Sequence, residues 1–212
     1  MGHRKLLAGA LLLASVVGCQ ASSRWHATDV TGVFPPLEMT LTRVSDGQLV
    51  TAGDYRGKVV MLYFGFSHCK NVCPITLANV ERVFQELGPA ARSVRMLFVT
   101  VDPERDTPAV LAKYVHEFGP GIVGLRADPD QLTRLVRRYR AAYSVTPQGP
   151  DRPYLVTHSS AIYVFDQTGA ARLLVSSLSS GQPDVSGVVD DLKRLVRSER
   201  PRGFFASMWE RI

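Results

Sequence analysis

The chain has 212 residues but only three cysteines, Cys19, Cys69 and Cys73, so at most one disulfide can form within it. It also lacks long apolar runs. The run Leu6–Val17 is short for a helix that crosses a bilayer. Hydrophobic residues make up 45% of the chain and charged residues 21%, which are ordinary values for a globular protein. This composition excludes a disordered chain and a multi-span membrane protein.

The basic residues form no continuous block, although the chain has a formal charge of +6. Their densest group, four arginines within 134–140, lies on an expected helix, where it is read as a solvated face. No motif for nucleic-acid binding accompanies it, so we expect no nucleic-acid partner. The sequence also has no internal repeat and no sign of a second domain, which indicates one well-cored domain with extensions.

The N-terminus has the pattern of a targeting segment. Residues 3–5 are His-Arg-Lys, and the apolar run Leu6–Val17 follows them, as in a signal peptide. The run leads into Val16-Val17-Gly18-Cys19, which resembles the lipobox of bacterial lipoproteins. That resemblance implies that residues 1–18 are a lipoprotein signal peptide and that Cys19 is lipidated. An uncleaved signal anchor with an incidental cysteine is the alternative.

These features predict how the chain is divided and where it is located. We expect a lipidated tether at 19–33, the folded domain at 34–198 and an amphipathic tail at 199–212. The predicted location is the bacterial cell envelope, with the domain lipid-anchored to the membrane on the extracytoplasmic (periplasmic) side. In that oxidising compartment the pair Cys69 and Cys73 tends towards a disulfide unless it is kept reduced or bound to a metal.

Hydrophobic periodicity predicts strands that alternate with helices. Residues 25–33 are expected to be a loose linker, and 146–152 a loop. The expected strands are at 37–50 (a hairpin), 59–64, 94–99, 122–125, 161–165 and 171–175. The expected helices are at 75–87, 108–118, 129–139 and 183–197. Strands separated by helices imply parallel crossovers and an α/β layer structure.

Two cysteines lie in the stretch Gly65–Pro74, between an expected buried strand and an expected helix. Pro74 suits the first turn of a helix, where its missing N–H costs nothing. Helix N-termini favour negative charge and therefore thiolates. Two thiols one helical turn apart can bind the same ion or close a disulfide, and both uses remain open at this point.

The order of elements resembles a thioredoxin-like fold, here with an N-terminal β-hairpin and an inserted helix-strand-helix. That fold usually has two residues between its cysteines, whereas this chain has three, Lys70–Val72. It usually also places a cis-proline opposite the cysteines, where this sequence has His158. The resemblance therefore predicts an imidazole facing two thiols. Such a donor set suits copper in either oxidation state, whereas zinc would need a fourth ligand.

Three ordered stretches, 64–74, 101–108 and 158–163, are similar to motifs of the SCO/SenC family. The resemblance extends over roughly residues 30–198. Proteins of this family are membrane-tethered copper-binding proteins with a thioredoxin-like fold. They help to assemble the binuclear copper centre of cytochrome c oxidase. The resemblance thus implies a copper-binding domain in this chain.

Transferred to this sequence, the resemblance implies that Cys69, Cys73 and His158 bind copper, as Cu(I) or Cu(II). It implies that Asp102 supports the site from beside the ligands rather than binding the metal. The chain departs from the family at two positions. Lys70 stands where a proline is frequent, and Thr157 stands where an aspartate commonly precedes the histidine.

We predict a metallochaperone rather than an enzyme. It would deliver copper to the copper-bearing subunit of cytochrome c oxidase, and other copper chaperones are expected partners. The alternatives are a thiol–disulfide oxidoreductase, paired with thioredoxin-like reductants, that reduces the copper-ligand cysteines of that subunit, and a copper or redox sensor. A peroxiredoxin-like peroxidase is disfavoured, because the chain lacks the Pro/Thr pattern expected before the reactive cysteine. His68 adjoins Cys69 and is expected to point away from the site.

Overall fold

The fold is taken from a computed structural model, which describes residues 24–149 and 154–198. Its centre is one sheet, in which β4, β5 and β6 are parallel and every other neighbouring pair is antiparallel. From edge to edge the strands are β1 (Thr28–Asp29), β10 (Ala171–Val175), β9 (Ile162–Phe165), β4 (Val59–Gly65), β5 (Val94–Thr100), β6 (Ile122–Arg126), β2 (Thr40–Arg43) and β3 (Leu49–Thr51).

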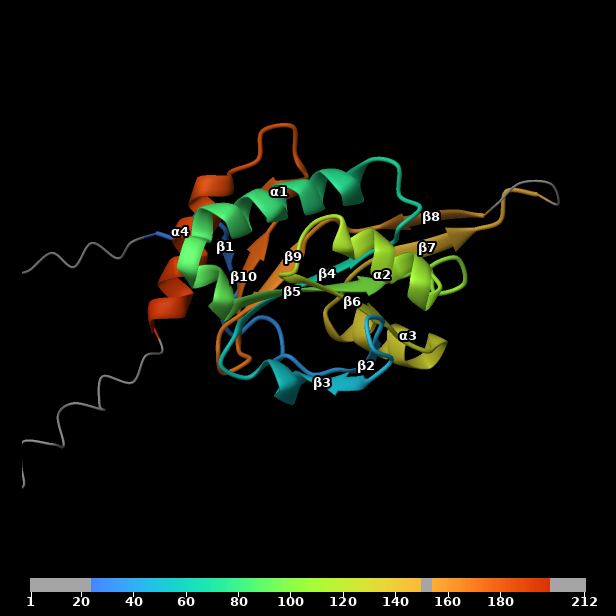
Figure 1. Cartoon of the computed structure of the whole chain (residues 1–212), viewed down its shortest axis with the longest axis horizontal. Helices are drawn as coiled ribbons and strands as arrows, with labels where there is room; N and C mark the ends of the chain where they lie inside the picture. Colours follow the sequence, from blue (N-terminus) through green and yellow to red (C-terminus); the bar gives the residue numbers. More distant parts are fainter. Residues whose placement is uncertain (1–23, 150–153, 199–212) are drawn as a thin grey trace, which may run out of the picture.

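Helices cover both faces of this sheet, as Figure 1 shows. Helices α1 (Val72–Leu87), α2 (Pro108–His116) and α4 (Val185–Ser198) pack on one face, and α3 (Pro129–Arg138) packs on the other. Three short 3-10 helices complete the described chain: η1 (Ala52–Tyr55), η2 (Gly88–Ser93) and η3 (Ser177–Ser179). None of the described helices is long and apolar enough to cross a membrane.

Strand β4 is the centre of both cores, because all of its residues are buried. Successive side chains of a strand point to opposite faces. Val59, Met61 and Tyr63 accordingly belong to the core under α1 and α4. The residues between them, Val60, Leu62 and Phe64, belong to the core against α3. An uninterrupted apolar strand is what a sheet covered on both faces requires.

The starts of two helices follow the sequence signals. Thr107 caps α2, since its hydroxyl accepts the Val110 N–H at 3.4 Å, with Pro108 as the first helical residue. Asp128 caps α3 through a capping box with Gln131. These caps fix where the chain turns back after β5 and β6, at the carboxyl ends of the parallel strands.

A two-stranded ribbon lies outside the main sheet, at one end of the molecule (Figure 1). It pairs β7 (Tyr143–Thr146) with β8 (Leu155–His158), and Tyr143 lies opposite His158. The loop expected from residue 146 onwards is therefore the connection of a hairpin. Strand β7 was not predicted, because only four residues form it and three of them are exposed.

The expectation of a loose linker at 25–33 is wrong. Asp191 of α4, which is buried, accepts the backbone N–H groups of His26 and Ala27 at 2.8–3.1 Å. Strand β1 then pairs with β10, and Trp25 stacks under the guanidinium of Arg194 at 3.9 Å. A carboxylate that receives several N–H groups binds tightly, so this segment is strapped to α4.

The turn between β9 and β10 is fixed by the buried carboxylate of Asp166. It accepts hydrogen bonds from the Thr168 hydroxyl at 2.6 Å and the Arg172 guanidinium at 2.9 Å, and from two N–H groups of the turn. Burial raises the pKa of Asp166, but these hydrogen bonds outweigh burial, so its pKa lies below the usual value.

Some sequence predictions lie outside the described residues. These are the signal peptide at 1–18, the lipidation of Cys19 and the amphipathic tail at 199–212. The limits of the folded domain, 34–198, stay a prediction.

Candidate metal centre

The two cysteines lie where β4 passes into α1, at the carboxyl end of the parallel strands (Figure 1). Strand β4 ends at Gly65, and the Cys69 N–H donates to the Phe66 carbonyl at 3.3 Å, which closes the turn. Helix α1 then begins one residue before Cys73. The Cys73 N–H points back to the Cys69 sulfur at 3.5 Å. The helix start therefore directs an N–H group at the first thiol.

His158 ends β8 and turns towards the cysteines. Its Nε2 atom lies 3.1 Å from the Sγ atom of Cys73, although the two residues are 85 positions apart. Its Nδ1 atom lies 2.9 Å from the carbonyl oxygen of Ser159. A carbonyl can only accept, so Nδ1 carries the ring proton and Nε2 presents its lone pair. The rings of Phe66 and Tyr63 hold the imidazole edge-on, with centroids 5.6 and 5.8 Å away.

The donor atoms of Cys69, Cys73 and His158 all lie within 4.8 Å of one another. Bonds from a metal to sulfur or imidazole nitrogen are about 2.0–2.3 Å long, so two donors of one ion lie at most about 4.6 Å apart. The cluster needs to contract only slightly to hold one ion. Within residues 24–149 and 154–198 no fourth histidine, cysteine or carboxylate joins it. Two sulfurs and one imidazole fit a soft metal better than a closed four-ligand zinc site.

The two thiols differ in exposure and in proton affinity. Cys69 is half-buried, whereas Cys73 is fully buried. The hydrogen bond from the Cys73 thiol lowers the pKa of Cys69 to about 4; burial opposes this, and the N–H groups of Cys73 and Asn71 add to it. That same hydrogen bond, together with burial, raises the pKa of Cys73. The reduced pair therefore keeps one proton on Cys73 and presents Cys69 as the thiolate, and a metal must displace that proton.

Tyr63 is a further contact to the cluster that the sequence did not indicate. Its buried hydroxyl donates to the Cys73 sulfur at 3.7 Å. Burial, and then the negative charge that Cys73 carries whenever it is a thiolate, raise the pKa of this hydroxyl, so it stays protonated as a donor. Tyr63 lies on β4, where successive side chains point to opposite faces of the sheet, and this places it on the side of α1.

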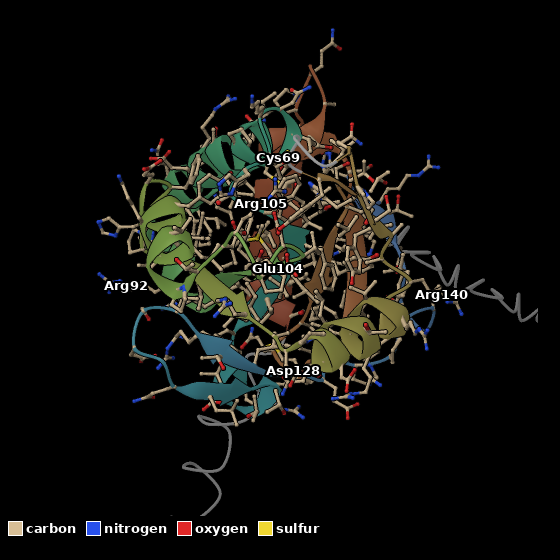
Figure 2. The ribbon with its side chains drawn as sticks, turned by 90° about the vertical axis from the view of Figure 1, so that its right-hand side faces the viewer. Cys69, Arg92, Glu104, Arg105, Asp128 and Arg140 are labelled. Atoms are coloured by element: carbon tan, nitrogen blue, oxygen red, sulfur yellow. The ribbon has the colours of Figure 1, made fainter. Side chains whose placement is uncertain are left out.

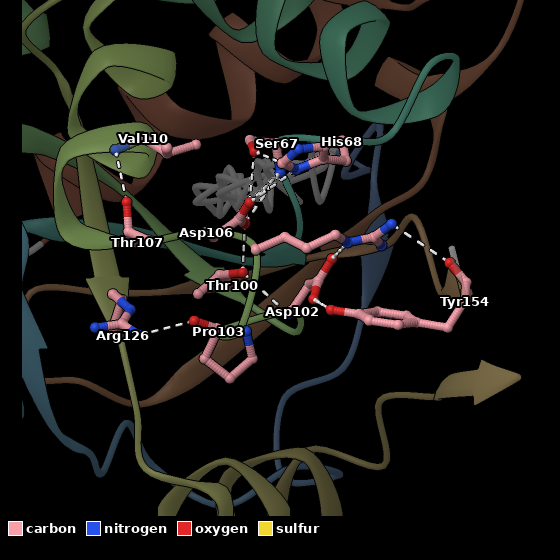
Figure 3. Close-up of polar contacts among 11 residues, drawn as sticks. Ser67, His68, Thr100, Asp102, Pro103, Asp106, Thr107, Val110, Arg126 and Tyr154 are labelled. Atoms are coloured by element: carbon pink, nitrogen blue, oxygen red, sulfur yellow. Dashed lines mark hydrogen bonds and ion pairs between the residues drawn. The ribbon is translucent and has the colours of Figure 1, made fainter. Parts of the chain in front are cut away.

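Asp102 lies outside the three-donor cluster, at the turn that follows β5 (Figure 3). Its carboxylate receives the Tyr154 hydroxyl at 2.5 Å and forms an ion pair with Arg105. Burial, and then the hydrogen bond to Asp102, raise the pKa of Tyr154 to about 12. The prediction that Asp102 supports the site without joining the donors agrees with this placement, and its functional role stays a prediction.

His68 does not join the cluster. Its Nδ1 atom lies 3.0 Å from the Ser67 hydroxyl and 3.5 Å from the carboxylate of Asp106. Asp106 itself is buried and was not singled out from the sequence, because an aspartate in a turn usually serves only as a cap. The only sequence signal for Asp106 was its place in the stretch 101–108, four residues after Asp102.

One of the three donors, Cys69, lines a hollow of about 620 Å³. Figure 2 looks onto this end of the molecule and labels Cys69 and Arg105, both of which line the hollow. Phe66 and Leu155 add apolar surface to it, and Leu155 is exposed. Cys69, rather than the buried Cys73, is therefore the sulfur that an approaching molecule meets first.

Known proteins are similar to this chain in sequence and in fold. A family model described as SCO1/SenC matches residues 40–197. The mitochondrial SCO2 homolog of Bos taurus is 42% identical over 125 residues, which are 58% of this chain and 47% of that protein. The chain spans about half the length of the curated relatives it matches.

Two solved structures with copper bound are similar to the chain. One is ScoI of Bradyrhizobium japonicum, with a TM-score of 0.67, 32% identity, and coverage of 76% of this chain and 98% of that chain. The other is yeast Sco1, with a TM-score of 0.66, 32% identity, and coverage of 79% of this chain and 92% of that chain. These likenesses confirm the predicted thioredoxin-like α/β fold.

Proposed function

The chain belongs to the SCO1/SenC family, and from that premise we propose that it is a copper metallochaperone. Copper is its cargo, held by Cys69, Cys73 and His158. The observation that carries this proposal is the placement of two sulfurs and one imidazole nitrogen within 4.8 Å of one another. Copper-bound relatives that are 32% identical support the choice of metal. Thiolates favour Cu(I), and the imidazole suits either oxidation state.

The acceptor of the copper is the copper-bearing subunit of cytochrome c oxidase, and other copper chaperones supply the metal. A copper ion with only three ligands can accept a further bond from an incoming thiol or imidazole. One of the three ligands, Cys69, is half-exposed and can be reached. Transfer then proceeds by ligand exchange, in which each new bond to copper replaces one bond to this chain. The hollow beside Cys69 supports an approach from that side.

Delivery to a membrane-embedded oxidase requires a donor close to the same membrane. We propose that lipidation of Cys19 provides this and that the domain faces the periplasm of a bacterial envelope. Both termini of the described domain leave it at the end of the molecule away from the ribbon that carries His158 (Figure 1). That arrangement supports a site that points away from an N-terminal anchor.

Titration of the purified, reduced full chain with Cu(I) against a chromophoric Cu(I) chelator tests the proposal. We expect one copper per chain, and a loss of affinity of at least tenfold in His158→Ala, since one of three ligands is removed. His116→Ala is the matched control, because His116 is exposed at the end of α2 and lies outside the cluster. Equal affinity of the two variants contradicts the ligand assignment.

A thiol–disulfide oxidoreductase is the second candidate, favoured by the unequal thiols. The Cys69 thiolate would attack a disulfide of the oxidase subunit and form a mixed disulfide. Cys73 would then attack the Cys69 sulfur, release the reduced partner and leave a Cys69–Cys73 disulfide, which a thioredoxin-like reductant reopens. His158 is needed for copper but not for these steps. A reductase assay in which His158→Ala retains full activity, with no copper requirement in cells, would favour this candidate.

A further inference from the structure

The two halves of the metal centre are carried by separate elements. The thiols belong to the loop between β4 and α1, and the imidazole belongs to the ribbon β7–β8. Within the described chain, β7 and β8 pair only with each other and not with the main sheet. An isolated two-stranded ribbon is marginally stable at best. The main sheet's hydrogen-bond ladder therefore does not fix where His158 lies, and other contacts must do so.

The turn Asp102–Asp106 lies between these halves. It follows β5, which runs parallel to β4, and Thr100 at the end of β5 lies opposite Gly65 at the end of β4. The Asp106 N–H donates to the Asp102 carbonyl at 3.0 Å and closes the turn. Both carboxylates are almost fully buried, at 2% and 0% exposure. Buried carboxylates need several donors, so their partners are informative.

Asp106 holds the cysteine half. Its carboxylate accepts the Ser67 N–H at 3.0 Å, the Ser67 hydroxyl at 2.5 Å and the Thr100 hydroxyl at 2.5 Å. Figure 3 shows these bonds meeting at one side chain. Ser67 lies two residues before Cys69. The start of the cysteine loop is thus bonded to the turn rather than left free.

Asp102 and Arg105 hold the histidine half. Tyr154, just before β8, donates its hydroxyl to Asp102 at 2.5 Å, while its own carbonyl accepts from Arg105 at 3.3 Å. The Arg105 guanidinium, ion-paired with Asp102, also stacks over the Tyr154 ring at 4.2 Å. Figure 3 shows the Tyr154 hydroxyl meeting the carboxylate of Asp102, which links the turn to the residue just before β8. Tyr154 lies four residues before His158.

We propose that the turn Asp102–Asp106 is a brace that positions both halves of the metal centre, with Arg105 and Tyr154 as positioning residues for His158 and Ser67 as the positioning residue for the cysteines. This rests on the proposed function, because it concerns that same site. The brace presets the distance between the imidazole and the thiols before metal arrives. Copper binding then loses less free energy to ordering the ribbon β7–β8, because the ribbon is already held in place.

The first test needs no metal. Amide hydrogen exchange on the full chain compares Tyr154→Phe, which removes one hydroxyl, with Tyr55→Phe. The Tyr55 hydroxyl is buried and makes no hydrogen bond within the described chain, and Tyr55 belongs to η1 rather than to the metal centre. We expect Tyr154→Phe to speed exchange in β7–β8 about tenfold, the loss typical of one hydrogen bond to a charged group, and to leave β4 and β5 unchanged.

Ser67→Ala is expected to give the complementary pattern. Exchange should quicken at residues 68–73 and remain unchanged in β7–β8. Faster exchange across the whole domain in either variant would mean general destabilisation and would overturn the brace. Unchanged ribbon exchange in Tyr154→Phe, equal to that of Tyr55→Phe, would overturn it as well.

The second test is a double-mutant cycle on Cu(I) affinity with Tyr154→Phe and His158→Ala. We expect Tyr154→Phe to lower affinity about tenfold in the parent chain and to have no further effect in His158→Ala, because it acts through the imidazole. An equal loss in both backgrounds, or no loss in the parent, would overturn the positioning role. A parent chain whose affinity does not depend on His158 would instead contradict the proposed function, and the exchange experiment would still decide on the brace.

Discussion

Replacing Gly65 with alanine would press directly on one ligand of the proposed copper site. Gly65 is the last residue of β4, and its backbone is not in the left-handed region, so alanine is compatible with its conformation. A Cβ atom there would lie 2.8 and 2.9 Å from two ring carbons of Phe98 and 3.0 Å from the sulfur of Cys73. Non-bonded carbon contacts are favourable at about 3.5–4.0 Å. The ring and the sulfur must therefore each move by about half an ångström or more.

Two effects follow from this displacement. Overpacking of a filled core costs about 1–3 kcal/mol of unfolding free energy. Cys73 is fully buried, and its sulfur lies 3.1 Å from His158 Nε2, so a shift of that size also changes the spacing of two metal donors. We expect Gly65→Ala to lower Cu(I) affinity about tenfold or more, which corresponds to about 1.4 kcal/mol.

Gly121→Ala provides the matched control. A Cβ atom at Gly121 would lie 2.7 and 2.8 Å from carbons of the Phe84 ring, and the three nearest atoms all belong to that ring. Urea unfolding should show a loss of stability in both variants, smaller in Gly121→Ala because the Phe84 ring is only partly buried whereas Phe98 is fully buried. Chelator competition should show a loss of Cu(I) affinity only in Gly65→Ala. Equal Cu(I) affinity of the two variants would refute the reasoning that the end of β4 sets the position of Cys73.

Three further predictions concern stability and are checked by urea unfolding. Asp166→Asn should cost about 1–3 kcal/mol at pH 7. Folding lowers the pKa of this carboxylate, so the difference in unfolding free energy between parent and variant should shrink as pH falls below about 4. The control is Asp190→Asn at an exposed position, which should change stability by less than about 0.5 kcal/mol throughout. Asp191→Asn should cost about 1–3 kcal/mol and speed exchange of the Ala27 amide. An unchanged exchange rate there would argue against Asp191 holding the N-terminal segment Trp25–Val30 to α4. Leu195→Ala, in the core of α4, should cost about 2–5 kcal/mol without changing Cu(I) affinity, and a lost affinity would show that the site depends on overall stability.

Local patterns predicted the elements that build the cysteine half of the site. The apolar run at 59–64 indicated a buried strand, and helical spacing after Pro74 indicated α1. Their junction placed Cys69 and Cys73 at a helix start, because two adjacent regular elements leave few residues between them. The position of His158 came from a resemblance of fold, since no local pattern relates residues 85 positions apart.

Contacts that depend on long-range pairing were not predicted from the sequence. Strand β7 has four residues and one half-buried side chain, so it carries no alternating pattern. The strap at Trp25–Val30 is held by a carboxylate of α4 and by pairing with β10, and neither can be read from the segment itself. Asp106 resembles any turn aspartate in sequence, and only its burial against Ser67 and Thr100 distinguishes it.

The most direct test of the copper site is X-ray absorption at the copper edge of the full chain loaded with one equivalent of Cu(I), compared with His158→Ala. The arrangement of Cys69, Cys73 and His158 predicts two sulfur neighbours and one imidazole nitrogen in the parent chain, and loss of the nitrogen in the variant. An all-sulfur shell in the parent, or the same nitrogen signal in both proteins, would contradict the assignment.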